Sequence, residues 1–491
     1  MLLKEKLQAR TKKKLNSPSM YKNFAEVKSA LASGVSVLEI TESYLKRIDE
    51  NKELNAFLEV FTDSVRANAV RVDEKIKAGD AGRLAGMVIG IKDNICYKGH
   101  KVSASSKILE GFESLYTATA LERLLNEDAI VIGRLNCDEF AMGSSNENSA
   151  FGPVRNPLNT NTVPGGSSGG SAAALAANLC TVSLGSDTGG SIRQPASFTG
   201  TYGIKPTYGR ISRYGLIAYA SSFDQIGAFT NTLEDNALVT EIMAGKDPMD
   251  STSTSREVGS YTMTPTSDKK RIAYMQEAYE MEGMQPEVKA RMDEVIATLK
   301  ADGHSVEPVS FPYLDYMVPT YYVLSTAEAS SNLSRFDGVH YGYRAKDAVG
   351  VEATYKKSRS KGFGPEVKRR IMAGTFVLSN EFYEAYYSKG QKVRRVLQNK
   401  TKAIFSDFDF VLTPTTPATA FELNAVNDPI QMYLQDIFTV HANLTGNPAI
   451  SLPYGKGNDG MPFGIQLMSA PFTEKDLYDF SAYLETKFKR N

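Results

Sequence analysis

Two short runs of glycine and serine lie close together in the chain and suit nucleophilic chemistry. The first spans residues 165–171 and reads GGSSGGS, and the second spans residues 189–191 and reads GGS. Because glycine loses more conformational freedom on folding than any other residue, a globular chain keeps such loops where backbone must pass close to something. A pair of flexible linkers is the alternative. A linker would not enclose the helix-like and strand-like segment that separates the two runs.

Ser191 is the best placed nucleophile in these runs. It follows the expected end of a strand and a turn built from Thr188, Gly189 and Gly190. An attacking serine needs a base that takes its proton, and the acyl intermediate that it forms needs donors for its oxyanion. The backbone N–H groups of Thr188, Gly189 and Gly190 could form that oxyanion hole.

The base is not expected to be a histidine, because the four histidines are scattered and none is near the glycine runs in sequence. Lysine is the known alternative, and Lys92 ends the apolar, strand-like segment MVIGIK. A neutral lysine requires the pKa to fall from about 10.4 by roughly 2 to 3 units, which desolvation at a buried strand end would supply. The competing interpretation is a surface lysine whose stem covers apolar side chains.

Composition excludes several classes of protein. The 491 residues include 42% hydrophobic side chains, and 56 basic residues balance 56 acidic ones, so no overall field attracts nucleic acid or an anionic membrane. No window offers the roughly 18 apolar residues of a membrane span, and no signal peptide is recognisable. These features predict a cytoplasmic protein. No metal site is expected, because the histidines form no pair and the cysteines lack the CxxC spacing: Cys96, Cys137 and Cys180.

The hydrophobic periodicity predicts an alternation of helices and strands, as in an α/β fold. Ser36 and Asp63 are the expected caps of two early helices. Helices are predicted at residues 24–32, 37–48, 64–77, 119–125, from about 171, and at 287–299, 366–378 and 381–405. Strands are predicted at residues 87–91, 129–132, 180–186, 271–275, 305–311 and 408–412.

Composition also divides the chain. Residues 1–20 form a basic tail, and residues 246–270 are polar and rich in serine and threonine, which predicts a surface linker. The strand, helix and strand that follow predict a βαβ unit at the start of an elaboration spanning residues 271–405. The long polar passage 138–170 is expected to be a functional loop, since ordered loops of this length usually are.

Three motifs taken together resemble the amidase signature family: GIKDNI at residues 90–95, GGSSGGS at 165–171 and GSDTGGSIRQPA at 185–196. The resemblance implies a single domain over residues 21–491, with a large central mixed β-sheet covered by helices on both faces. It also implies a Ser-Ser-Lys triad. Ser191 would be the nucleophile, Ser167 in a cis peptide the bridging serine, with Ser168 as the alternative, and Lys92 the base.

Longer segments, among them LNCDEFAMGSSNENSAFGPVRNP and GPEVKRRIMAGTFVLS, resemble the tRNA-dependent amidotransferase branch of that family. This implies glutamine hydrolysis, with the ammonia passed to a large B subunit that, together with a small C subunit, completes a heterotrimer. No cofactor is implied for this chain, since ATP and magnesium would be used by the partner. Mischarged tRNA would also be held mainly there. Whether Gln-tRNA or Asn-tRNA is the product stays open.

The same resemblance suggests how glutamine is held: Arg370 for its α-carboxylate, Asp436 for its α-amino group and Tyr321 nearby. Arg369 is an alternative to Arg370, and Tyr321 could instead be core packing. The segment HANLTGNPAIS departs from the pattern, because His441 stands where an apolar residue is expected. That histidine could alter the glutamine pocket or a subunit contact.

Three other functions compete with this one. A free-standing amide hydrolase of the same family would share the triad and act on another substrate. A nucleotide-binding protein is disfavoured, because neither glycine run reads GxxxxGK[ST]. A catalytically dead assembly subunit is disfavoured by the presence of Lys92, Ser167 and Ser191 together.

Overall fold

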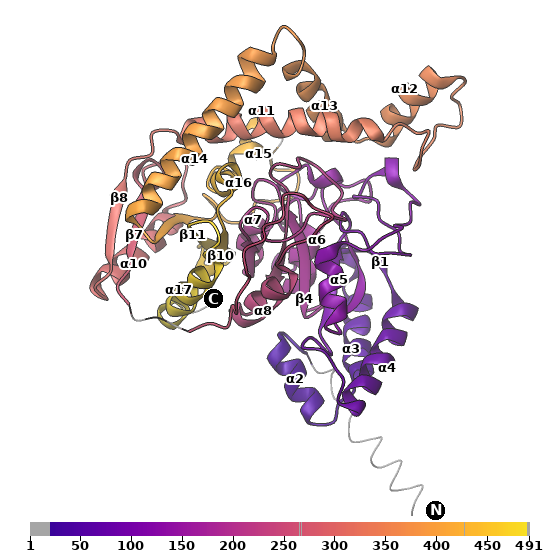
Figure 1. Cartoon of the computed structure of the whole chain (residues 1–491), viewed down its shortest axis with the longest axis horizontal. Coiled ribbons are helices and arrows are strands. Elements are labelled where there is room, and N and C mark those ends of the chain that lie inside the picture. The colour runs from indigo at the N-terminus through magenta and orange to yellow at the C-terminus, as the bar shows by residue number, and fades with distance from the viewer. Residues whose placement is uncertain (1–19, 265, 267, 427, 489–491) are drawn as a thin grey trace, which may run out of the picture.

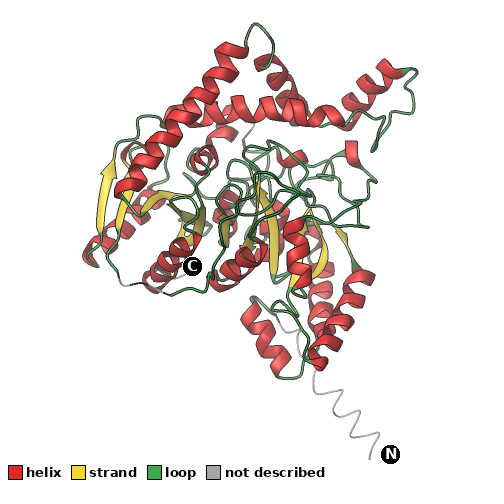
Figure 2. Ribbon diagram, viewed as in Figure 1, coloured by secondary structure: helices red, strands yellow, loops and turns green. Residues whose placement is uncertain are grey.

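A computed structural model describes residues 20–488, except residues 265, 267 and 427. The predicted tail at residues 1–20 lies outside the described residues, apart from Met20. One mixed sheet of eleven strands runs through the described chain (Figure 1; Figure 2). In order across the sheet the strands are β1 (Phe57–Val60), β3 (Ile130–Leu135), β2 (Val88–Lys92), β4 (Val182–Asp187), β6 (Gln225–Thr230), β5 (Tyr202–Lys205), β10 (Ala449–Lys456), β11 (Pro462–Ser469), β9 (Phe410–Pro414), β7 (Arg271–Met275) and β8 (Ser305–Val309).

Helices and short helical turns connect these strands. The α-helices are α2 (Phe24–Ala32), α3 (Val37–Glu50), α4 (Thr62–Ala78), α5 (Thr119–Asn126), α6 (Gly169–Ala176), α7 (Arg193–Thr199), α8 (Leu233–Met243), α9 (Gln276–Tyr279), α10 (Pro286–Ala301), α11 (Leu314–Asn332), α12 (Val351–Gly362), α13 (Pro365–Val377), α14 (Lys389–Asp407), α15 (Pro429–Leu434), α16 (Val440–Thr445) and α17 (Glu474–Lys487). The 3₁₀ turns are η1 (Lys52–Leu54), η2 (Lys107–Leu109), η3 (Glu139–Ala141) and η4 (Leu333–Arg335), and η5 (Tyr383–Ser388) is a π-helical segment.

The direction of the strands brings two chain segments to one edge of the sheet. β2 lies between β3 and β4 and is parallel to both. Lys92 ends β2, and Asp187 ends β4, directly before the glycine turn. Because parallel strands end at the same edge, and ligands of open α/β sheets bind outside the carboxyl ends of strands, this edge is where chemistry is expected.

Helices cover both faces of the sheet, as the alternation along β11 shows. Ile465 and Leu467 belong to the apolar cluster that includes α10 and α17. Gln466 points the other way, where Arg193 of α7 donates to its side-chain oxygen at 2.6 Å. Successive strand residues point to opposite faces, so α7 and α17 lie on opposite sides of β11. The predicted mixed sheet with helices on both faces is confirmed.

Helix α2 and strand β7 begin and end at the predicted residues. Ser36 caps α3 as expected, because its side chain accepts from the Glu39 N–H, and the Glu39 side chain in turn accepts from the Ser36 N–H, which completes a capping box. The predicted cap Asp63 is wrong: α4 begins at Thr62, and the capping position is Phe61. Asp63 lies in the first turn instead, where a carboxylate still complements the helix dipole.

The later part of the chain adds strands to the same sheet. β7 and β8 are parallel and joined through α10, so the predicted βαβ unit is present, and β7 pairs with β9. The predicted linker 246–270 has neither helix nor strand among its described residues. It is not wholly exposed, since Asp247 and Asp250 are buried, and Asp250 pairs with Arg213. No described helix is long and apolar enough to cross a membrane.

Helices α11 and α13 pack closely and carry Tyr321 and Arg370. Gly374 of α13 permits this contact, because a Cβ atom there would lie 1.9 Å from the carbonyl oxygen of Thr326 in α11. Figure 1 shows the two helices beside α14 at the top of the view. The absence of a side chain at Gly374 therefore sets the spacing between the two helices.

Gly374→Ala is expected to lower the free energy of unfolding by about 1 to 3 kcal/mol through overpacking against this backbone. The gain in helix propensity, at most about 1 kcal/mol, does not offset it. Urea denaturation measures the effect, and Met372→Ala on the exposed face of α13 is the control, expected within about 0.5 kcal/mol of the parent. A Gly374→Ala variant as stable as the parent would contradict the packing argument.

Candidate active site

The amino group of Lys92 lies among three serine hydroxyls. Its Nζ is 2.7 Å from Oγ of Ser167 and 2.9 Å from Oγ of both Ser168 and Ser186. Ser167 and Ser168 directly precede α6, and Ser186 lies in β4. The strand end and the helix start thus meet at the lysine.

Lys92 is fully buried. Burial lowers its pKa from the ordinary 10.5 to about 8, against the opposing charges of the carboxylates Asp138 and Asp187. Within the described residues no carboxylate forms an ion pair with it. About one tenth of the lysine is therefore neutral at pH 7 and about half at pH 8, and the neutral form is the one that can act as a base.

The backbone before Ser167 is tightly enclosed. The Gly166–Ser167 peptide bond is cis, as the family resemblance implies. A Cβ atom on Gly166 would lie 2.2 Å from Oδ2 of Asp138 and 2.6 Å from the backbone nitrogen of Ser145. The Asp138 N–H donates to the carbonyl oxygen of Ser167 at 3.0 Å, and the Gly166 N–H donates to Oε1 of Gln194 at 3.0 Å. Only glycine fits at position 166.

Ser191 lies beside this serine pair, at the end of the glycine turn. Its carbonyl oxygen accepts from the Ser168 N–H at 3.3 Å, and the residue is 8% exposed. In the described chain its hydroxyl has no hydrogen-bond partner, and the N–H groups of Gly189, Gly190 and Ser191 donate to no residue. The turn therefore presents free donors next to a hydroxyl, which is the composition of an oxyanion hole with its nucleophile. The hydroxyl of Thr188 donates to Oδ1 of Asp224 at 2.7 Å, and the role of its backbone N–H in the oxyanion hole stays a prediction.

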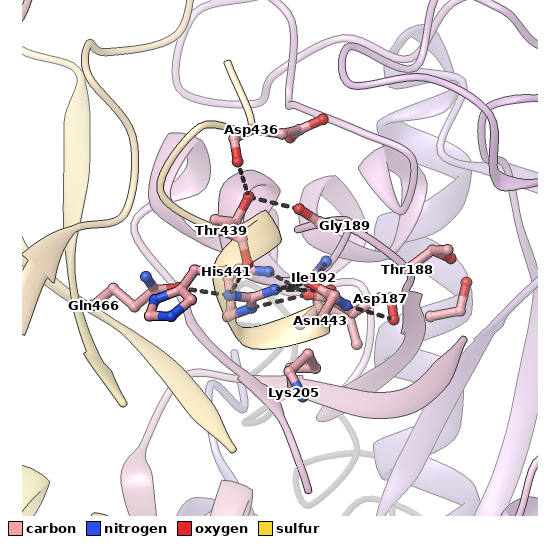
Figure 3. Close-up of polar contacts among 12 residues, drawn as sticks. Asp187, Thr188, Gly189, Ile192, Lys205, Asp436, Thr439, His441, Asn443 and Gln466 are labelled. Carbon is pink, nitrogen blue, oxygen red and sulfur yellow. Dashed lines mark hydrogen bonds and ion pairs between the residues drawn. The ribbon is translucent and has the colours of Figure 1, made fainter. Parts of the chain in front are cut away.

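An ion pair inside the motif holds the turn and was not assigned a role from the sequence. Nη2 of Arg193 lies 3.0 Å from Oδ1 of Asp187, and both side chains are fully buried. Burial alone would raise the pKa of Asp187, but the Arg193 guanidinium beside it lowers that pKa below its ordinary value. Asn443 of α16 donates to the same carboxylate at 2.9 Å (Figure 3). The ends of the turn are thereby fixed to each other and to α16.

Two of the predicted substrate-binding residues pack on the glycine turn. A Cβ atom on Gly189 would lie 2.7 Å from the hydroxyl of Tyr321, and one on Gly190 would lie 3.3 Å from Oδ1 of Asp436. Asp436 accepts from the Ser144 hydroxyl at 2.6 Å, and burial raises its pKa to about 7. The structure thus brings Tyr321 and Asp436 to the turn before Ser191.

Arg370 is nearly buried among phenol rings. Its guanidinium donates to the Tyr219 hydroxyl at 2.8 Å and to Oε1 of Glu366 at 2.8 Å, and it faces the ring of Tyr433 at 5.5 Å. Arg370 and Arg369 both line a cavity of about 310 Å³. Arg369 also contacts Glu366 but is half exposed. Both arginines remain candidates, and burial favours Arg370.

Part of the lining of that cavity packs against Gly166, the residue before Ser167. Gly143 and Ser145 line it together with Arg370, and the backbone nitrogen of Ser145 is the atom that crowds Gly166. A small molecule in the cavity would therefore contact the arginines and Ser145, whose backbone packs against Gly166.

His441 faces away from these groups. Its Nε2 lies 2.7 Å from the Thr401 hydroxyl of α14, and its ring packs against Phe311. Burial lowers its pKa to about 3, so the ring is neutral at physiological pH. The ring therefore contacts α14 and Phe311, and an influence of His441 on the glutamine pocket or on a subunit contact stays a prediction.

Sequence reasoning missed Ser186, Asn94 and Ser144. Asn94 donates to Oγ of Ser186 at 2.9 Å and so orients a hydroxyl that contacts Lys92. Asn94 and Ser186 lie inside the quoted motifs, so a polar residue beside a predicted catalytic one was the available signal. Ser144 lay in the long polar loop, with no local signal that it would meet Asp436.

The arrangement suits acyl transfer, and a phosphonofluoridate tests it because an activated serine displaces its fluoride. Labelling of Ser191 is expected to rise about tenfold per pH unit below pH 7 and to level off above about pH 8, since protonated Lys92 cannot accept a proton. Lys92→Met is expected to slow labelling at least 100-fold. Mass spectrometry of the labelled peptide follows the rate.

Lys205→Met is the matched control. Lys205 is also a fully buried lysine, burial lowers its pKa to about 7, and its amino group donates to the Pro206 carbonyl oxygen. This variant should keep both the rate and the midpoint near pH 8. A pH-independent rate, or a loss in the Lys205 variant with none in Lys92→Met, would refute the assignment of the base.

The sequence profile of the Amidase family matches residues 39–478. The chain is 49% identical to the A subunit of Glutamyl-tRNA(Gln) amidotransferase from Fusobacterium nucleatum, over 94% of this chain and 95% of that protein. It is 51% identical to the protein of the same name from Koribacter versatilis, over 89% and 92%. The crystal structure of the same amidotransferase component from Thermotoga maritima aligns with a TM-score of 0.77 and 38% identity, over 93% of this chain and 92% of the other. This chain therefore belongs to the Amidase family.

Proposed function

We propose that this chain is the glutaminase subunit of a tRNA-dependent amidotransferase. It hydrolyses glutamine to glutamate and ammonia, and the ammonia converts Glu-tRNA(Gln) to Gln-tRNA(Gln), or Asp-tRNA(Asn) to Asn-tRNA(Asn), on a partner. The observation that carries the activity is a buried amine of lowered pKa, 2.7 Å from Ser167, beside a turn of free N–H groups. The likeness to proteins whose names describe them as the A subunit of such an enzyme supports the substrate.

In the proposed mechanism, neutral Lys92 accepts the proton of Ser167 while Ser167 accepts that of Ser191. The Ser191 oxygen attacks the side-chain amide carbon of glutamine, and the N–H groups of the turn stabilise the oxyanion. The proton returns along the same path to the leaving nitrogen, so ammonia departs and a glutamyl ester remains on Ser191. Water, activated by the same base, then releases glutamate and restores the serine.

The pocket fits the other end of glutamine. A guanidinium matches a carboxylate, so Arg370, or Arg369 in the alternative, would hold the α-carboxylate. Asp436 would pair with the α-ammonium, and Tyr321 packs on the same turn, at Gly189. Because burial raises the pKa of Asp436 to about 7, an arriving ammonium replaces a proton that the empty site tends to keep.

The proposal includes partners. A B subunit would bind ATP, magnesium and most of the mischarged tRNA, and a small C subunit would complete a cytoplasmic heterotrimer. This chain needs no cofactor of its own, because the proposed relay uses only its side chains and backbone. The names of its relatives, which call each of them a subunit, support the assembly.

Ser191→Ala is expected to abolish glutamine hydrolysis and glutamine-dependent amidation, by at least about 1,000-fold, because the nucleophile is gone. Amidation driven by added ammonium chloride should continue at the parent rate, which also verifies that the complex assembles. Both reactions are measured on the purified complex with mischarged tRNA. Retention of glutamine-dependent amidation would refute the nucleophile, and turnover of unrelated amides without any need for partners would favour the free-standing amide hydrolase.

Arg370→Met is expected to raise the KM for glutamine about 10- to 100-fold, since it removes a charge-assisted bond to the carboxylate. Arg369→Met, the matched control one residue earlier, should leave KM within about threefold of the parent. Phosphonofluoridate labelling of Ser191 should persist in both variants and so report an intact nucleophile. The opposite order of effects on KM would assign the carboxylate to Arg369.

A further inference from the structure

Thr439 joins the proposed glutamine pocket to the glycine turn. It lies in the turn between α15 and α16, three residues after Asp436, and is fully buried. Its hydroxyl donates to the carbonyl oxygen of Gly189 at 2.7 Å and also approaches the carbonyl oxygen of Asp436 at 3.0 Å (Figure 3). A side chain from the last third of the chain therefore holds the backbone just before the nucleophile.

The bond to Gly189 fixes the direction of the next N–H group. The carbonyl of Gly189 and the N–H of Gly190 belong to one planar trans peptide, so they point in opposite directions. With the carbonyl tied to Thr439, the Gly190 N–H points away from Thr439. That N–H donates to no described residue, which leaves it available to an oxyanion.

The turn needs such a tether. Gly190 has φ of +143°, a conformation that side-chain-bearing residues rarely adopt, and two successive glycines leave the peptide between them free to rotate. A Cβ atom on Gly190 would lie 2.1 Å from Oγ1 of Thr439. Gly190 thus admits the hydroxyl, and the hydroxyl limits the rotation that glycine permits.

The tether is itself held rigidly. Nη1 of Arg193 donates to the carbonyl oxygen of Thr439 at 2.8 Å and to Gln466 at 2.6 Å, while its other nitrogens pair with Asp187. The turn is therefore clamped at Asp187, before its first glycine, and at Gly189 within it. Both clamps meet at the same guanidinium.

From this geometry we propose that Thr439 is a positioning residue for the oxyanion hole: its hydroxyl sets the Gly189–Gly190 peptide so that the Gly190 N–H faces the reacting carbonyl. The proposal rests on the proposed glutaminase function for its substrate. It assigns Thr439 to the reaction step and not to glutamine binding, because the hydroxyl bonds are to backbone carbonyls and leave the Asp436 carboxylate to Ser144.

The test compares Thr439→Val, which keeps the shape and removes the hydroxyl, with Thr439→Ser, which keeps the hydroxyl. In the purified complex, Val is expected to lower kcat for glutamine hydrolysis about 10- to 100-fold with KM within twofold, since loss of one oxyanion donor costs about 100- to 1,000-fold and here the donor is only misaligned. Ser should recover kcat to within about threefold. Thr445→Val in α16 is the control, because among the described residues its hydroxyl bonds only to the His441 carbonyl, and it should match the parent.

Parent-like kcat in Thr439→Val would overturn the proposal, as would a rise in KM alone, which would place the hydroxyl in glutamine binding. Equal losses in Val and Ser would also overturn it, since the hydroxyl that Ser retains would then bring no recovery of kcat. Phosphonofluoridate labelling of Ser191 should slow in parallel in the Val variant, because its phosphoryl oxygen uses the same donors. If the parent hydrolyses no glutamine, the proposed function fails, and the labelling rates of Val and Ser still decide the role of Thr439. Thermal unfolding verifies that each variant is folded.

Discussion

Burial of the Lys92 amino group among hydroxyls, with no carboxylate paired to it in the described chain, is the constraint on which the site depends. Hydroxyls satisfy the N–H groups but do not compensate a full positive charge, so desolvation lowers the pKa to about 8. An ion pair at this place would hold the proton and remove the base. The three serines that surround the amine therefore hold it in place by hydrogen bonds without pairing its positive charge.

Keeping Lys92 unpaired requires control of the acidic groups nearby. Asp187 ends the neighbouring strand, and its charge raises the pKa of Lys92. Arg193 lies against that carboxylate, with both groups fully buried, so the negative charge is largely compensated within its own pair. A buried pair of this kind adds little net stability. Its physical effect here is to compensate the charge of Asp187 close to Lys92, and it also holds the turn that carries Ser191.

The sequence predicted those features that depend on local order. The periodicity located α2 and β7, and the end of an apolar strand located Lys92. Arg193 contacts Thr439, 246 positions away, and Ser144 contacts Asp436, 292 positions away. No local pattern around these residues predicts either contact. The predicted cap at Asp63 failed because a cap depends on the angle at which the chain enters the helix, and Phe61 occupies that position.

Strand order explains why residues so distant meet. β10 and β11 insert between β5 and β9, so the turn before α16 lies over the end of β4, although Asp436 and Asp187 are far apart in sequence. The groups proposed for bond making come from residues 92–191, while those proposed for holding glutamine come from helices α11 and α13 and the turn before α16. Chemistry and recognition are thus built from separate parts of the chain. A change in the later helices can alter the substrate while the lysine and its serines stay in place, whereas a change in the turn that carries Asp436 acts on both, because that turn also contacts Gly189.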